Sequence, residues 1–201
     1  MLVTRTGIND RIERFAKLTG ELESGADLYA VGSALQLTPI EQMSFYEGLD
    51  GPLYDNLSAK ACARVLMRLD SLISEASARY DYDVISVEHV LPQTPKAGSK
   101  WLDWFPDPAT RAAIVHRVGN LALLSRSKNS QASNWDFDRK KDSYFRRGKV
   151  SPFPLTTEVL VVKEWLPKEV EERQKRLMKK FEDHWRLIDR KSIDELLDDL
   201  Q

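Results

Sequence analysis

Cysteine is almost absent from this chain. Cys62 is the single cysteine among 201 residues, which excludes an intramolecular disulfide and a zinc cluster built on cysteines. Cys62 lies among the apolar residues Ala61, Ala63, Val65 and Leu66, so the sequence predicts a buried, inert thiol rather than a nucleophile.

Long apolar runs and charge of one sign are also absent. No run approaches the length of a membrane span, and the first residues lack the basic-then-apolar pattern of a signal peptide, so we expect a reduced, cytoplasmic protein. The net charge is -1, from 30 Lys and Arg against 31 Asp and Glu, and does not by itself indicate a nucleic-acid binder. No phosphate-binding loop is found, because Gly-Lys-Ser/Thr occurs nowhere in the chain.

What is present is the composition of an ordinary globular protein, with 42% hydrophobic and 30% charged residues. We expect a mainly α-helical fold with a small ββα core packed between helical segments. The pattern divides the chain into a helical region (1–80), the core (81–150) and a second helical region (151–201).

Helical spacing of apolar residues marks both outer regions. The clearest element follows Ser58, a candidate N-cap, and weaker patterns predict a helix over residues 9–22 and a short one after Thr38 and Pro39. In the last region, Pro167 suits the first turn of a long helix running to about Arg190. A capping-box pattern at 192–195 predicts a short terminal helix.

The central region changes in character. Residues 84–91 are β-branched and short, and Pro92 ends this predicted strand. A polar, proline-rich loop follows, then a second apolar run at 118–124 and a basic, amphipathic helix at 134–145. Strand, loop, strand and helix is the order that a ββα nuclease core requires.

Four residues of this region carry the chemistry of phosphodiester hydrolysis. A neutral imidazole can accept a proton from water near pH 7, which makes His89 the candidate general base. Glu88 and Asn129 offer oxygen atoms to a divalent metal, and the amide of Asn120 could hydrogen-bond the backbone or orient the imidazole of His89. Adjacent residues of a regular strand face opposite sides, so Glu88 and His89 serve one site only if the strand bends or ends there.

Three segments carry a resemblance to a known family. Glu88-His89-Val90-Leu91-Pro92-Gln93, residues 116–124 and residues 127–134 together resemble the C-terminal HNH nuclease domain of GmrSD-type restriction proteins, the modification-dependent DNA nucleases of bacterial phage defence. The resemblance implies that the ββα core is a ββα-metal core of the HNH or His-Me finger type. It also implies His89 as general base, Asn120 as an orienting residue and Asn129 as a metal ligand, with Mg²⁺ or Mn²⁺ bound. Glu88 stands where relatives often have Asp, and its extra methylene favours ligation through water.

Basic residues cluster directly after the predicted metal ligand. Between 126 and 149 there are eight basic residues against three acidic ones. Contacts of such residues with phosphates give affinity for DNA without sequence information, although most charge runs are simply solvated faces. The candidate DNA contacts are Arg126, Lys128, Arg139, Lys140, Lys141 and Arg146. For Trp101, Trp104 and Trp135 we expect core packing rather than base stacking.

The sequence therefore predicts a metal-dependent HNH endonuclease that nicks or cuts DNA in restriction of phage. Two alternatives stay open: a non-catalytic DNA-binding or assembly module with a ββα fold, and a nuclease directed at RNA. Relatives of this type usually carry an N-terminal nucleotide-hydrolysing sensor domain or subunit, which we expect to lie outside this chain. His116 is expected to pack or face solvent, and His184 to be structural.

Overall fold

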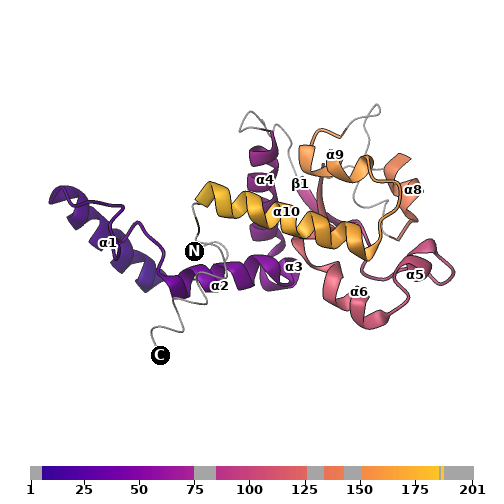
Figure 1. Ribbon diagram of the computed structural model, residues 1–201, viewed down its shortest axis with the longest axis horizontal. Helices are drawn as coiled ribbons and strands as arrows, with labels where there is room; N and C mark the ends of the chain where they lie inside the picture. Colours follow the sequence, from indigo (N-terminus) through magenta and orange to yellow (C-terminus); the bar gives the residue numbers. More distant parts are fainter. Residues whose placement is uncertain (1–5, 75–84, 126–133, 143–150, 186, 188–201) are drawn as a thin grey trace.

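Helices dominate the computed structural model of the chain, which describes residues 6–74, 85–125, 134–142, 151–185 and 187 (Figure 1). One small antiparallel sheet is present in this part of the chain. The fold is therefore mainly α-helical, as the sequence predicts.

The described part of the N-terminal region, residues 6–74, contains four helices. Their bounds are Ile8–Glu23 for α1, Pro39–Asp50 for α2, Leu53–Asn56 for α3 and Ala59–Ile73 for α4. Ser58 caps α4 as predicted, because its side chain accepts a hydrogen bond from the backbone N–H of Ala61. Thr38 and Glu41 form a capping box that begins α2, and Pro39 occupies its first turn.

The sheet pairs two five-residue strands, β1 (Ile85–His89) and β2 (Leu121–Ser125). Their register places Ile85 opposite Ser125 and His89 opposite Leu121. The second strand is shorter than expected, because residues Val118–Asn120 form a 3-10 turn, η1, before β2 begins. A Cβ on Gly119 would lie 2.5 Å from the backbone oxygen of Val170, so η1 is packed directly against a later helix.

The stretch expected to be a loop between the strands contains two helices, α5 (Lys100–Trp104) and α6 (Pro108–Val115). Asp107 caps α6, since its carboxylate accepts from the backbone N–H groups of Ala109 and Thr110. The basic helix predicted for 134–145 is short: α8 spans Phe137–Lys140, and residues 143–145 lie outside the described part.

Two helices complete the fold, α9 (Pro154–Leu160), which the sequence did not indicate, and α10 (Pro167–Trp185). The long predicted helix after Pro167 is confirmed up to Trp185. The terminal helix predicted around 192–195 lies outside the described residues. None of the described helices combines the length and apolarity that a membrane crossing requires.

The sheet separates two hydrophobic clusters, because successive residues of a strand point to opposite faces. Leu121 and Leu123 belong to the larger cluster, which combines residues of α2, α3, α4 and α10, while Ala122 and Leu124 belong to the smaller one. The smaller cluster contains the two fully buried tryptophans of the described residues, Trp101 and Trp165, together with Phe105 and Phe137. Side chains of successive residues at the end of β1 therefore enter two different environments.

Candidate functional site

Asn120 fixes the chain just beyond the end of β1. Its Oδ1 accepts from the backbone N–H of Leu91 at 2.8 Å and from Trp165 Nε1 at 3.1 Å. Its Nδ2 donates to the backbone oxygens of Leu91, at 3.0 Å, and of Val115, at 2.9 Å. Since the side chain is fully buried, these four bonds satisfy the whole amide. Asn120 thus bonds the backbone two residues after His89, the first of the two roles considered for it.

His89 is the last residue of β1 and lies in a small cluster of rings. Its Nε2 is 3.1 Å from Nδ1 of His116, and the two rings are nearly perpendicular, at 88°. The ring of Tyr54, from α3, meets His89 edge-on at a centroid distance of 4.5 Å and stacks on His116 at 5.7 Å. On the other side, Nε2 of Gln93 lies 3.3 Å from Nδ1 of His89.

The imidazole of His89 is held in its neutral form. Burial, together with the nearby His116 and Lys140, which act in the same direction, lowers the pKa of His89 from 6.5 to about 3. The residue is 7% exposed. A neutral imidazole has one nitrogen with a lone pair, so His89 has the protonation state that a proton acceptor needs.

Glu88 points to the opposite side of the strand. Its Oε1 accepts from Nζ of Lys140, at 2.7 Å, and the same ammonium group donates to the backbone oxygens of His89, at 2.7 Å, and Val90, at 3.1 Å. Lys140 is fully buried, and burial lowers its pKa while the charge of Glu88 opposes the change. Strand pairing continues through His89, so the alternation of side chains sends Glu88 and His89 to different faces.

These contacts bear on whether the described residues fit a divalent metal. The carboxylate of Glu88 is a suitable hard ligand, but one of its oxygens is held by a buried ammonium group, which would repel a cation. No group of three or more His, Cys, Asp or Glu in the described ranges could hold a metal ion. Asn129, the other predicted ligand, lies outside these ranges. The described residues alone therefore do not make up a metal site.

The candidate DNA contacts have different surroundings. Lys140 is fully buried, so in this conformation it pairs with Glu88 and does not reach a phosphate, contrary to expectation. Lys141 is also largely covered, and its Nζ donates to the backbone oxygen of Val162 at 3.0 Å. Arg139 is exposed, and its guanidinium lies 3.8 Å from the ring centre of Trp135. Arg126, Lys128 and Arg146 lie outside the described residues.

The comparison with known protein families gives a match over more than half of the chain. The family model described as "GmrSD restriction endonucleases, C-terminal domain" matches residues 43–180. The chain belongs to this family. No curated protein and no solved structure matches the chain.

Membership of the GmrSD C-terminal domain family indicates a nuclease of the restriction type. The matched range includes α3, both strands and most of α10, so it contains every described residue of the His89 cluster. Helix α1 lies before it. The ring cluster is therefore part of the GmrSD C-terminal domain and not of the flanking chain.

The sequence missed several members of this cluster in the GmrSD domain. Asp55 belongs to the cluster as well, because its Oδ1 lies 3.5 Å from Nε2 of His116. Tyr54 and Asp55 lie in a four-residue helix more than thirty positions before His89, and no local pattern connects them to it. His116 gave a weak signal, since it stands four residues before Asn120, but a lone histidine is usually structural. The contact between the two imidazoles comes from the antiparallel pairing of β1 with β2, which no spacing in the sequence expresses.

Proposed function

We propose that this GmrSD-type domain is an HNH DNA endonuclease with His89 as its general base. The observation that carries the proposal is a neutral, buried imidazole at the end of β1, held through a backbone that Asn120 fixes. An imidazole in this state can take the proton of a water molecule that attacks a phosphate. When the negative phosphate approaches, it stabilises the imidazolium that forms, which offsets the effect of burial.

The ββα-metal core and the metal itself are the parts of the proposal that rest on the sequence resemblance. Mg²⁺ or Mn²⁺ would stabilise the charge on the phosphate and on the leaving oxygen. Glu88 and Asn129 are the proposed ligands, with Glu88 acting through water because Lys140 holds one of its oxygens. Asn129→Ala should lower activity most at low metal concentration, and added metal should restore part of it.

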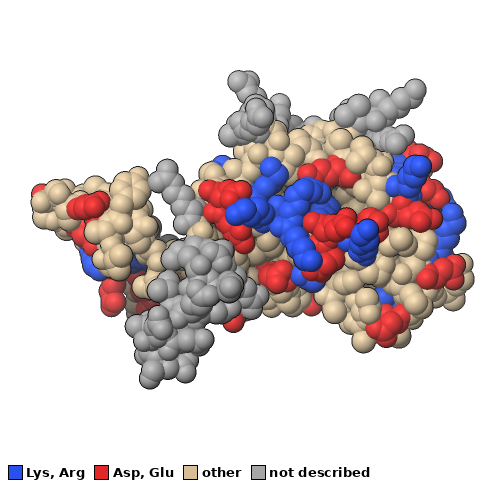
Figure 2. Space-filling model, in the orientation of Figure 1, with Lys and Arg blue, Asp and Glu red and all other residues tan. Residues whose placement is uncertain are grey.

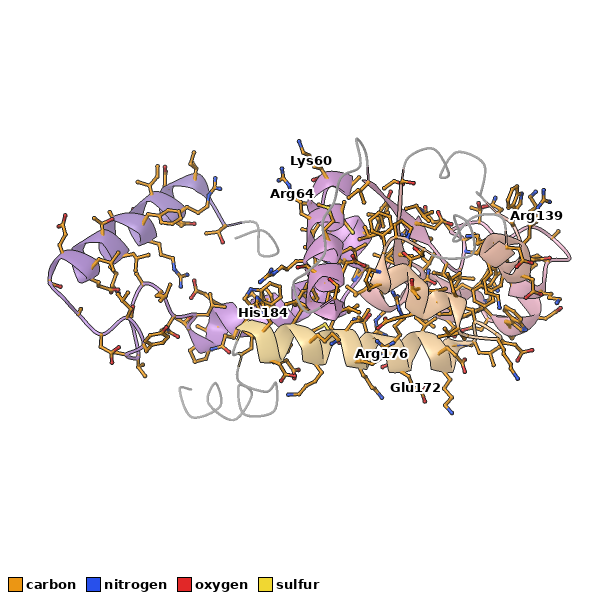
Figure 3. The ribbon with its side chains drawn as sticks, turned by 90° about the horizontal axis from the view of Figure 1, so that it is seen from above. Lys60, Arg64, Arg139, Glu172, Arg176 and His184 are labelled. Carbon is orange, nitrogen blue, oxygen red and sulfur yellow. The ribbon has the colours of Figure 1, made fainter. Side chains whose placement is uncertain are left out.

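DNA would meet the side of the molecule opposite to α10. Figure 2 shows Lys and Arg interleaved with Asp and Glu over α10, so the described part of that face carries charges of both signs. In the view of Figure 3, Arg139 lies on the other side, as do the exposed residues Lys60 and Arg64 of α4. Arg139→Ala and Lys60→Ala/Arg64→Ala should weaken DNA binding, whereas Arg176→Ala on the α10 side serves as the matched control.

The test of the nuclease proposal is cleavage of supercoiled plasmid with Mg²⁺ or Mn²⁺. Nicked or linear product is expected from the chain, and none from His89→Ala, which should still bind DNA. His184→Ala, which removes an exposed histidine remote from the site, is the control and should cleave normally. Full activity of His89→Ala would exclude His89 as the base.

One observation favours a second function, a DNA-binding module without catalysis. The pairing of Lys140 with Glu88 removes the carboxylate that precedes His89 in the chain from simple metal ligation. Such a module would bind DNA with a marked salt dependence and give no product with any divalent ion. The plasmid assay therefore distinguishes the two functions.

In the cell, we propose that this domain is the effector part of a restriction system that acts on phage or modified DNA. A nucleotide-hydrolysing sensor, as a further domain or a separate subunit, would control it. Addition of that partner to an inactive but folded domain, followed by the plasmid assay, tests this part of the proposal.

A further inference from the structure

Four side chains form a continuous series of polar contacts through the two imidazoles. Nε2 of Gln93 is 3.3 Å from His89 Nδ1, and His89 Nε2 is 3.1 Å from His116 Nδ1. At the far end, His116 Nε2 lies 3.5 Å from Oδ1 of Asp55 in α3. Every ring nitrogen of the two histidines thus has one polar neighbour.

The carboxylate at the end of the series sets the direction of its hydrogen bonds. An ionised carboxylate only accepts, so the Nε2 of His116 that faces Asp55 is the nitrogen that carries hydrogen. When His116 is neutral it has one N–H group, which leaves its Nδ1 as an acceptor. His89 must then donate through its own Nε2–H, and its Nδ1 is left without hydrogen.

The neighbour at the other end agrees with this direction. The amide nitrogen of Gln93 is a donor, and it faces the nitrogen of His89 that the argument leaves bare. The opposite direction would place a bare Nε2 of His116 against the negative charge of Asp55, with two sets of lone pairs facing each other. Gln93 is exposed, so a water molecule can replace its amide at this nitrogen.

We propose that Asp55 and His116 are positioning residues that fix the tautomer of His89, so that Nδ1 is the nitrogen that takes the proton from water. This inference rests on the proposed function, in which His89 is the base. In the step itself a proton moves from the attacking water to Nδ1, while the Nε2–H bond to His116 is kept. The resulting imidazolium is then stabilised by the negative charge of Asp55 through the ring of His116.

The surrounding structure holds this arrangement in place. The ring of Tyr54 stacks on His116 with an interplanar angle of 12° and meets His89 edge-on. The backbone N–H of Tyr54 donates to the backbone oxygen of His116 at 3.2 Å, and Leu53 beside it is fully buried. Helix α3 is therefore anchored on the loop that carries His116, and it brings Asp55 with it.

The first measurement is the tautomer of each histidine, by ¹⁵N NMR of the metal-free protein at pH 7.5. Both His89 and His116 are expected as the Nε2–H form. In His116→Phe, which keeps a ring against Tyr54 but removes the acceptor, His89 should become a mixture of tautomers. An Nδ1–H form of His89 in the unmodified protein overturns the proposal. Because the NMR measurement does not depend on activity, it tests the tautomer of His89 even if the domain cuts no DNA.

The second measurement is plasmid cleavage, with kcat and KM determined separately. His116→Phe should lower kcat about ten- to hundred-fold with little change in KM, as is common when a residue that orients a functional histidine is lost. His116→Asn, whose Oδ1 can take the place of Nδ1 as acceptor, should recover much of the loss, and Asp55→Ala should cost less than His116→Phe. His184→Phe, the same change at a remote histidine, is the control.

Each result has one meaning. Full activity of His116→Phe overturns the positioning role even if the tautomers are as expected. Equal losses in His116→Phe and His116→Asn, with both folded, show that the acceptor at this position does not matter and also overturn it. If His116→Phe does not fold, the kcat values of His116→Asn and Asp55→Ala are compared with that of the unmodified domain. A lower kcat of Asp55→Ala supports the positioning role, and full activity of both variants overturns it. Absence of cleavage by the unmodified chain counts against the proposed nuclease, not against the tautomer.

Discussion

At the scale of single residues, Lys140 and Glu88 form the most demanding contact of the domain. Lys140 is fully buried, and its ammonium group has a carboxylate and two backbone oxygens as partners. Burying two charges is costly, and their attraction repays this cost only while both are present. Removal of one member should therefore lower the free energy of unfolding more than replacement of both members by apolar residues.

Lys140→Met should lower the free energy of unfolding by roughly 3 kcal/mol, because it leaves the carboxylate of Glu88 buried without its partner. Lys140→Met combined with Glu88→Leu should recover most of this loss. Urea unfolding of the two variants and the unmodified protein measures both effects. Lys175→Met, at an exposed position of α10, is the control and should change little. Equal stabilities for the single and double variants would contradict the pairing.

His89 gives the domain a stability that depends on pH. Its folded pKa of about 3 lies below the unfolded value near 6.5, so between these values the unfolded chain binds more protons. This contribution is complete above pH 6.5 and is lost as the pH falls. Between pH 7 and pH 5 the expected loss is about 2 kcal/mol.

The comparison that isolates this effect is urea unfolding of the unmodified protein and of His89→Gln over the same pH range. Glutamine does not titrate, so the difference between the two free energies of unfolding should shrink as the pH falls. Parallel curves for the two proteins would show that His89 is not held neutral.

At the scale of elements, the packing of η1 on α10 sets the position of the site. A Cβ added to Gly119 would lie 2.5 Å from the backbone oxygen of Val170, and Arg173 of α10 donates to the backbone oxygens of Gly119 and Leu121 at 2.8 and 2.9 Å. Since Asn120 follows directly, any displacement of η1 also moves the residue that fixes the chain beyond His89.

Gly119→Ala should therefore lower the free energy of unfolding by about 1–3 kcal/mol and reduce cleavage as well. Gly20→Ala is its matched control. Gly20 lies inside α1, and nothing is within 4 Å of a Cβ built there, so alanine should stabilise the helix by about 0.5–1 kcal/mol. Thermal unfolding of the two variants should shift in opposite directions. Similar shifts would exclude close packing at Gly119.

The elements also show how far the sequence could predict the fold. Helices α4 and α10 were predicted because a long apolar face and a cap or a first-turn proline are local signals. Helices α5 and α6 are five and eight residues long, and the prolines around them favoured a loop, although Asp107 and Pro108 are a valid helix start. No separate helix was predicted for α9, which has seven residues. The order of the site residues along the chain was visible, but the position of His116 against His89 depends on strand pairing, and the burial of Lys140 on tertiary packing.

At the scale of the whole molecule, stability is distributed unevenly. Helix α1 has no buried residue, and its apolar side chains Ile8, Ile12 and Phe15 are 58–65% exposed. Figure 1 shows it extending away from the rest of the molecule. By contrast, α4 and α10 contribute to the larger hydrophobic cluster.

Hydrogen exchange should therefore be much faster in α1 than in α4 and α10, because α1 can open without exposing buried apolar surface. Mass spectrometry of the exchanged protein, resolved by peptide, measures this. The slowest amides of α4 should exchange only by global unfolding. Equal protection of α1 and α4 would show that α1 has packing partners beyond those described.

The anchoring of α3 beside His116 limits how such a domain can be inherited. A recombination event with its boundary between residues 56 and 85 would transfer both strands and His89 but leave Tyr54 and Asp55 behind. The recipient would gain a recognisable core whose histidine pair lacks the ring and the carboxylate beside it. We therefore expect that natural fusions which carry this domain have their junction before residue 53. A survey of the junctions in such fusions tests this expectation.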